Sequence, residues 1–247
     1  MLVFRCALML LTALIGGALS ATAAAAQIYV MESTVATIRV GSTLELNAAI
    51  SIPAGSHIRA VLPSGKTQTI KGPYEGTMAD LAKGQPINEG VLASLKNLLR
   101  TGGATQNTAG ATRSIARPAD TPPRVAFSWS AIPVAKGTVC VDKGAKLVLI
   151  RSPSPNAERA TMIDATTGKQ AELQWEPGSD TALWPATLTL RNDGTYDVLS
   201  AGREPRRITL RVLDRLPSED NLLIELNRLG CSSQFDAWVR GKLAAGN

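Results

Sequence analysis

Cysteine is the residue type whose placement in this chain points most directly to a chemistry. There are three cysteines, and Cys6 lies in an N-terminal segment that resembles a cleaved export signal, which leaves Cys140 and Cys231. In an oxidising compartment two such thiols favour a disulfide. Their pairing would close a loop of about 90 residues and constrain the unfolded chain by about 4 to 5 kcal/mol. Two buried free thiols are the alternative, and a zinc site would need further ligands.

Acid–base chemistry has few candidates. Any mechanism with a histidine base must use His57, the single histidine, which precedes an expected strand. No G-x-S-x-G nucleophile elbow occurs. Glu219 and Asp220 fall in an expected first helical turn, where negative charge complements the helix dipole. We predict no catalytic, cofactor-binding or metal-binding residue and no cofactor, although carboxylates distant in sequence could still meet in a hydrolase site.

Residues 60–67, Ala-Val-Leu-Pro-Ser-Gly-Lys-Thr, resemble a relaxed phosphate-binding loop. Such a loop needs a strand before it and a helix after it, whose N-terminus faces the phosphate. Here the residues after the glycine alternate like a strand, and Pro73 follows. We therefore predict a hairpin turn at Ser64 and Gly65, and no nucleotide binding.

Arginines form the densest run of positive charge between residues 203 and 215. Nucleic-acid binding would place aromatic residues among them, and none occurs between Tyr196 and Phe235. Contact with anionic envelope polymers or lipid headgroups is one interpretation, and an edge strand protected by charge is the other. The candidate anion contacts are Arg203, Arg206, Arg207 and Arg211.

The N-terminus indicates export. Arg5 precedes an uncharged apolar run, and residues 21–26 are small, which together are typical of a secretory signal peptide over residues 1–26. The alternative is an uncleaved anchor over residues 6–26, long enough to span a bilayer. We expect a bacterial protein that is periplasmic or secreted, and that contacts the membrane only if this segment is retained.

Composition limits the fold class. The 247 residues are 45% hydrophobic with a net charge of +6, values that exclude a collagen, a wholly disordered chain and a multi-span membrane protein. The length fits one large domain or two ordinary ones.

Turn residues about every ten positions divide residues 27–76 into short expected strands, as in a small antiparallel β module. One expected strand covers residues 36–40. Asn88 can cap a helix that carries an apolar stripe from Val91 to Leu99. The first module therefore spans residues 27–100.

Residues 101–124 carry one large apolar side chain among many glycines, prolines and threonines, and we predict an interdomain linker there. About eight strands follow within residues 125–216, which predicts an immunoglobulin-like sandwich. The first expected strand covers residues 125–129, and residues 192–194 are expected to join strands at 188–190 and 196–199 as a tight hairpin. Residues 217–247 predict a helical hairpin with a break at Gly230. The expected fold is mainly β, with two small sandwich-like modules, one helix after the first and two helices at the C-terminus.

A family resemblance accompanies this pattern. The steps Val-Gly-Ser-Thr-Leu at residues 40–44, Ala-Ile-Ser-Ile-Pro-Ala-Gly-Ser at 49–56 and the Ser-Gly hairpin within 60–70 resemble the FecR-like periplasmic domain. The resemblance covers about 50 residues. It implies a small β domain that contacts envelope proteins or relays signals without catalysis. The chain lacks the anti-sigma portion and internal membrane segment of the signalling members of that family.

These observations lead to one expectation about function and one alternative. The chain is expected to be an exported, non-enzymatic protein that contacts an envelope protein or polymer. The alternative is a cell-envelope hydrolase with carboxylates that the sequence does not identify.

Overall fold

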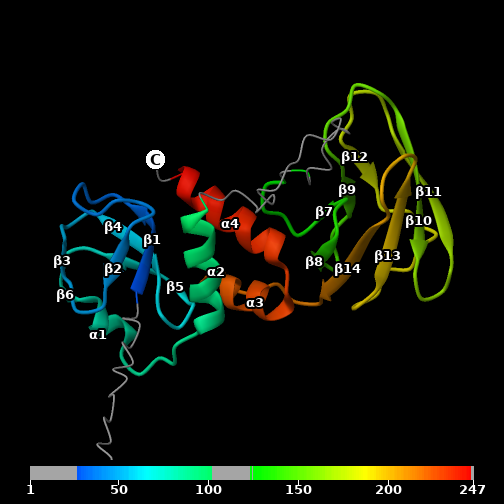
Figure 1. The fold of residues 1–247 in the computed structure, drawn as a ribbon. Helices are drawn as coiled ribbons and strands as arrows, with labels where there is room; N and C mark the ends of the chain where they lie inside the picture. The colour runs from blue at the N-terminus through cyan, green and yellow to red at the C-terminus, as the bar shows by residue number, and fades with distance from the viewer. Residues whose placement is uncertain (1–26, 102–122, 124, 246–247) are drawn as a thin grey trace, which may run out of the picture.

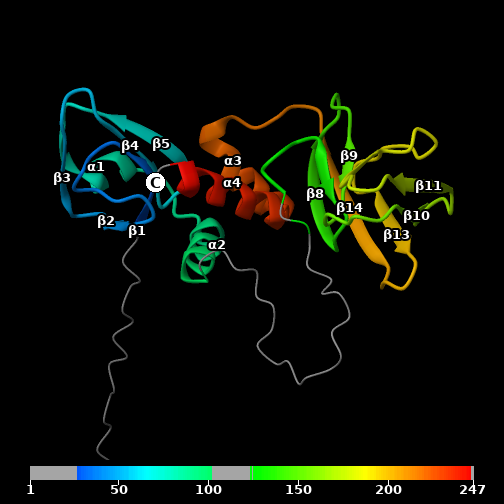
Figure 2. The same cartoon turned by 90° about the horizontal axis from the view of Figure 1, so that it is seen from above.

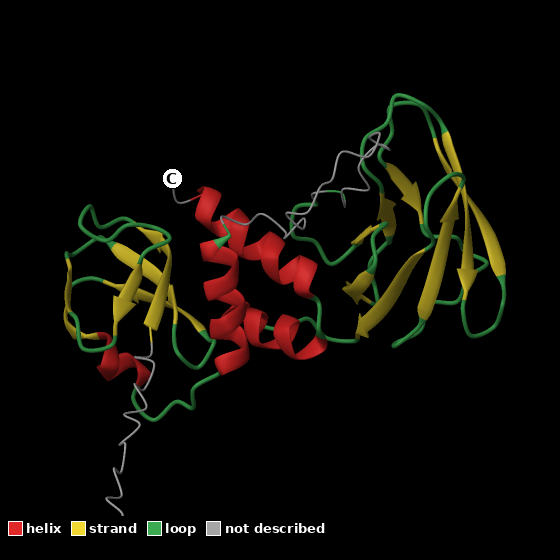
Figure 3. Cartoon of the chain, in the orientation of Figure 1, coloured by secondary structure: helices red, strands yellow, loops and turns green. Residues whose placement is uncertain are grey.

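The computed structural model describes residues 27–101, 123 and 125–245, which form two β modules on either side of a layer of helices (Figure 1, Figure 3). The predicted signal peptide and most of the predicted linker lie outside the described residues. The fold is mainly β, and the order of elements confirms the predicted class, with a helix after the first module and a helical pair at the C-terminus.

The first module has two small sheets, one of four strands in the order β2-β1-β4-β5 and one formed by β3 and β6. Alternation along β1 and β4 sends Ile28, Val30, Ile58 and Ala60 into a core that the second sheet closes. The elements are β1 Gln27–Ser33, β2 Thr43–Glu45, β3 Ala49–Ile52, β4 His57–Val61, β5 Thr67–Lys71, β6 Tyr74–Thr77, α1 Met78–Ala82 and α2 Glu89–Arg100.

One expected strand of this module is wrong. Residues 36–40 form turns, not a strand. Val35 and Ile38 are nevertheless buried, because the Ile38 amide donates to the Val35 carbonyl and the turn directs both side chains into the core. The apolar residues of this segment are therefore buried side chains of a loop and do not indicate a strand. The sixth strand is β6, in a segment that the sequence analysis did not assign.

The second module is a sandwich of a five-stranded sheet, in the order β11-β10-β13-β14-β8, and a three-stranded sheet, in the order β12-β9-β7. About eight strands were expected and eight are found, but the expected strands at residues 125–129 and 188–190 are wrong, and β7 and β12 lie in segments where none was expected. The strands are β7 Ala131–Pro133, β8 Gly137–Asp142, β9 Val148–Ile150, β10 Glu158–Asp164, β11 Gln170–Trp175, β12 Thr181–Leu183, β13 Thr195–Ser200 and β14 Arg206–Leu213. A turn is present at Asn192, Asp193 and Gly194 before β13, with Asp193 at a φ of 59°, but the predicted hairpin is wrong because no strand precedes the turn at residues 188–190.

The helical layer consists of α2 and the C-terminal elements η1 Glu219–Asn221, α3 Leu222–Leu229 and α4 Ser232–Ala245. The predicted Asn88 cap is present, since its Oδ1 accepts from the Val91 amide. Gly230 separates α3 from α4 with a φ of 74°, the left-handed conformation predicted there. Seen from above, the layer lies between the two modules (Figure 2). None of the helices in the described residues is long and apolar enough to cross a membrane.

The predicted disulfide between Cys140 and Cys231 joins β8 to the turn between α3 and α4. The next turn of α4 reinforces this attachment with Gln234. Its Oε1 accepts from the Cys140 amide at 2.7 Å, and its Nε2 donates to the carbonyls of Cys140 at 2.7 Å and Ser128 at 2.8 Å. The side-chain amide therefore hydrogen-bonds the free edge of β8 as a neighbouring strand would.

The disulfide should supply a large part of the free energy of unfolding. For a separation of 91 residues, the double variant Cys140→Ala and Cys231→Ala should lose about 4 to 5 kcal/mol, because the unfolded chain regains loop entropy. Urea unfolding of the two oxidised preparations measures the difference. Alkylation without reductant should add no label to the chain from Gln27 onward, in which Cys140 and Cys231 are the two cysteines. Two labels on unreduced protein, or equal unfolding free energies, would contradict the assignment.

Candidate functional site

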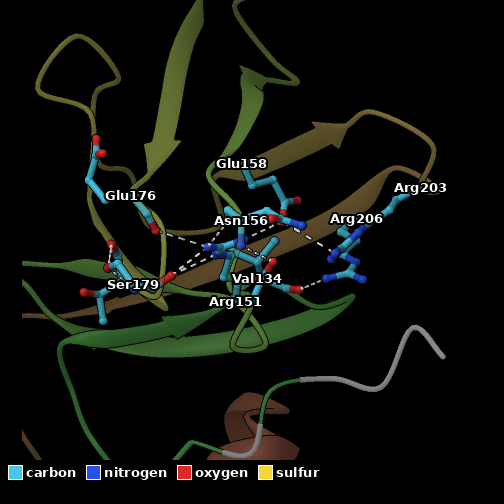
Figure 4. A network of polar contacts seen from close by, with 10 residues as sticks. Val134, Arg151, Asn156, Glu158, Glu176, Ser179, Arg203 and Arg206 are labelled. Atoms are coloured by element: carbon cyan, nitrogen blue, oxygen red, sulfur yellow. Dashed lines mark hydrogen bonds and ion pairs between the residues drawn. The ribbon is translucent and has the colours of Figure 1, made fainter. Parts of the chain in front are cut away.

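A polar cage lies at the side of the sandwich where the chain crosses from β11 to β12 (Figure 4). Its centre is Arg151, the residue that follows β9, whose side chain is 2% exposed. Burial of a guanidinium is costly unless its charge and its N–H groups are matched.

Arg151 has a matched partner on each side. Its Nη1 lies 2.9 Å from Oε2 of Glu158. Its Nη2 donates to the carbonyls of Ser179 at 2.8 Å and Asn156 at 3.1 Å, and more weakly to that of Glu176 at 3.4 Å, while Nε donates to Ser179 at 3.1 Å. The guanidinium also lies 5.8 Å from the Trp175 ring centroid. The cage therefore fixes the start of β10 and the crossover after β11 to the end of β9.

A second arginine shares the same carboxylate. Nη2 of Arg203, in the loop between β13 and β14, lies 3.5 Å from Oε2 of Glu158. Nearby, Nη1 of Arg206 donates to the Val134 carbonyl at 2.7 Å (Figure 4). Two of the predicted anion contacts thus lie at the rim of the cage, and both have partners within the chain.

The other two predicted anion contacts point away from the cage. Arg207 and Arg211 lie on the outer face of β14, because the intervening Ile208 and Leu210 enter the core. Arg207 pairs through two nitrogens with Asp197 of β13, at 2.8 and 2.9 Å, and Arg211 pairs with Asp193. The structure does not bring the four arginines together, and anion contact at any of them stays a prediction.

The edge-strand interpretation of this run is wrong. β14 lies between β13 and β8, and it pairs with β8 in parallel register. The sequence could not reveal this, because β8 is about 70 residues earlier in the chain. On the outer face of β14, Arg207 instead forms a cross-strand ion pair with Asp197, and Arg211 pairs with Asp193 in the turn before β13. The hydrogen bonds from Arg207 hold the pKa of Asp197 below its ordinary value.

The phosphate-loop lookalike is a hairpin turn, as predicted. The Gly65 amide donates to the Leu62 carbonyl, and strand β5 follows the turn. A Cβ added to Gly65 would lie 3.1 Å from side-chain atoms of Val91 in α2 and Ile224 in α3. The turn therefore serves as a packing contact between the first module and the helices. His57 opens β4 and is half-buried.

Glu219 has a role that the sequence analysis missed. It lies in a first helical turn, that of η1, as predicted. In addition, its Oε1 lies 2.9 Å from Nη2 of Arg59 in β4 and 3.0 Å from Nζ of Lys242 in α4. Burial alone would raise the pKa of Glu219, and hydrogen bonds from Lys242 and Arg59 outweigh that effect, so its pKa is lowered. One carboxylate thus joins the first module to both ends of the C-terminal segment.

A shallow depression of about 320 Å³ adjoins the cage on the outer face of β7 and β9. Asp180 contributes the carboxylate in its lining, which is otherwise formed by Val125, Ala126, Phe127, Ser128, Ala131 and Ile150. A second carboxylate of interest is Asp236 on α4, whose pKa is raised by burial against the lowering effect of Arg240. Within the described residues no three His, Cys, Asp or Glu side chains come together as a metal site.

Comparison of the chain with known protein-family models finds no match, and comparison with curated proteins finds none either. The FecR-like resemblance of the first module therefore remains an expectation from its turn and strand pattern.

Replacing Arg151 should be far more damaging than replacing Arg203. Arg151→Met removes the charge facing Glu158 and leaves the Ser179 and Asn156 carbonyls without their donors, which should cost about 3 kcal/mol or more. Arg203→Met, a matched change at a side chain that is 34% exposed, should cost about 1 kcal/mol or less. Urea unfolding measures both. Equal losses would show that the cage is not a structural cross-link.

Proposed function

We propose that this chain is an exported, non-enzymatic protein that acts by contact with a protein or polymer of the bacterial cell envelope. The observation that carries the proposal is the architecture: two β modules fixed at opposite ends of one helical layer (Figure 1). Such a unit presents two separate surfaces at a fixed spacing, as a bridging or scaffolding protein requires.

A continuous apolar cluster fixes the modules. Tyr29 and Met31 of β1 pack against the same helices that cover Cys140 of β8. The helical side chains in this cluster include Val91, Leu95 and Leu98 of α2, Leu222, Leu223 and Leu226 of α3, and Phe235, Trp238 and Val239 of α4. Because interior side chains are close-packed, the modules and the helices form one body, which lowers the entropy lost on binding.

The charged groups also favour contact over catalysis. Five ion pairs of the described residues join segments that are separate in the sequence: Arg59 with Glu219, Arg151 with Glu158, Arg191 with Asp164, Arg207 with Asp197 and Arg211 with Asp193. A hydrolase needs two carboxyl groups on either side of one bond. Asp180, in the depression beside the cage, and Asp236, whose pKa is raised by burial, lie in different parts of the fold, Asp180 in the sandwich and Asp236 on α4.

Export is supported by the disulfide, since such bonds persist in oxidising compartments. The FecR-like pattern of the first module agrees with an envelope setting. The N-terminal export signal remains a prediction from residues 1–26.

The proposal is tested with the chain from Gln27 onward, carrying its disulfide. We expect saturable co-sedimentation with isolated envelope fragments, and no turnover of peptidoglycan sacculi, p-nitrophenyl esters or casein. Asp180→Asn and Asp236→Asn should leave binding unchanged. Turnover that either substitution abolishes, or sedimentation that does not saturate, would contradict the proposal.

The contact that Glu219 makes with Arg59 and Lys242, between the first module and the helices, should weaken in acid. Because the pKa of Glu219 is lowered in the folded state, its contribution to stability is present above its ordinary pKa of about 4.5 and is lost as the pH falls through the folded value. Glu219→Gln should therefore be less stable than wild type at pH 7 and lose less stability between about pH 5 and pH 2. Asp220→Asn controls for net charge. Parallel curves for wild type and Glu219→Gln would contradict the assignment.

A further inference from the structure

We propose that β11 is a self-association surface, on which β11 of a second copy of this chain adds as an antiparallel strand, with the twofold axis at Leu173. The result would be a continuous sheet across the two copies. This inference goes beyond the proposed function, because it holds whatever the envelope partner is.

The free edge of β11 carries unpaired backbone groups. β11 is the last strand of its sheet, and it pairs with β10 in a regular antiparallel register without a bulge. The Asp164 amide donates to the Lys169 carbonyl at 2.9 Å, and hydrogen-bonded pairs alternate along such a ladder. Ala171 and Leu173 therefore bond to β10, while the N–H and C=O groups of Gln170, Glu172 and Gln174 point outward.

Two other sheet edges of the described residues, those of β8 and β12, are protected in ways that β11 is not. The edge of β8 is occupied by the Gln234 side chain. β12 has three residues, and the backbone of its first residue bonds to the Ser179 hydroxyl. β11 has six residues and contains no proline, lysine or bulge, the usual means of blocking strand addition.

The side chains along this edge favour a second copy as the occupant. Outward positions alternate between amide and carboxylate: Gln170, Glu172, Gln174 and, just past the strand, Glu176. In an antiparallel pair centred on Leu173, Glu172 of each copy lies opposite Gln174 of the other, and Gln170 lies opposite Glu176. Each carboxylate therefore meets an amide donor.

Neighbouring registers are poorer. A pair centred on Glu172 places two carboxylates directly opposite each other, which is destabilising. A pair centred on Ala171 leaves Glu176 without an amide opposite it. Gln174 donates to Glu176 within the chain, with Nε2 and Oε1 2.7 Å apart, which shows that an amide and a carboxylate pair on this face of the sheet.

The Arg151 cage holds this edge in place before any partner arrives. Arg151 contacts the Glu176 carbonyl just after β11 and the carboxylate of Glu158, the residue of β10 that lies opposite Trp175. Trp175 and Leu173 are buried in the sandwich core. A strand fixed at its end and along one face loses little conformational freedom when a second strand pairs with it.

The test is sedimentation equilibrium of the disulfide-bonded chain from Gln27 onward. Wild type should dimerise. Gln174→Glu places two like-charged pairs across the interface and should raise the dimer dissociation constant by about 2- to 30-fold, and Gln174→Lys creates two ion pairs and should lower it by a similar factor. Thr43→Glu and Thr43→Lys make the same charge changes on the exposed edge strand β2 and should leave it unchanged.

A backbone variant completes the test. Glu172→Pro removes an outward N–H without removing a bond to β10, a position where an edge strand accepts proline. It should abolish the dimer and leave the circular dichroism spectrum unchanged. A monomeric wild type, or a dimer with equal responses to both Gln174 substitutions, would overturn self-association through β11. A monomer that still binds envelope fragments would leave the proposed function standing.

Discussion

The attachment of α4 to the edge of β8 is the constraint on which the rest of this structure depends. The Cys231 disulfide and two hydrogen bonds between the Gln234 side chain and the Cys140 backbone hold the start of α4 against Cys140, and a third hydrogen bond from Gln234 goes to the Ser128 carbonyl. The edge of a sheet normally exposes backbone groups to solvent or to other chains. Here the Gln234 side chain satisfies those of Cys140, so the start of α4 is fixed to the sheet by hydrogen bonds as well as by the disulfide.

The position of the helices then determines how the first module sits. α3 and α4 present their leucine and aromatic side chains to β1 and α2, and Gly65 permits the β4–β5 turn to approach α2 and α3. Glu219 closes this contact with two cations, one from each side. The two β modules have separate cores. They become one body only through a third core that the C-terminal segment completes.

Local signals predicted the parts of this fold that short segments determine. Asn88 before an apolar stripe gave the helix start, Gly230 gave the break between α3 and α4, and the Ser64–Gly65 step gave a hairpin. The disulfide between Cys140 and Cys231 was predicted only from the oxidising compartment that the N-terminal segment indicates. Arg151, Gln234 and Glu219 could not be found in this way, because their partners lie on other elements and the sequence pattern around each is that of an ordinary surface residue. The parallel pairing of β14 with β8 was missed for the same reason.

The treatment of strand edges connects the fold to its function. The chain uses a side chain to close the edge of β8 and a hydroxyl to occupy part of β12, yet leaves a regular six-residue edge open at β11. An open edge carries a risk of indiscriminate pairing, and its alternating amides and carboxylates reduce that risk by penalising registers that oppose two carboxylates. The same alternation does not lower the stability of the monomer, since these side chains are exposed. Selection for a specific strand partner explains both features at once, whereas a purely structural edge would require neither.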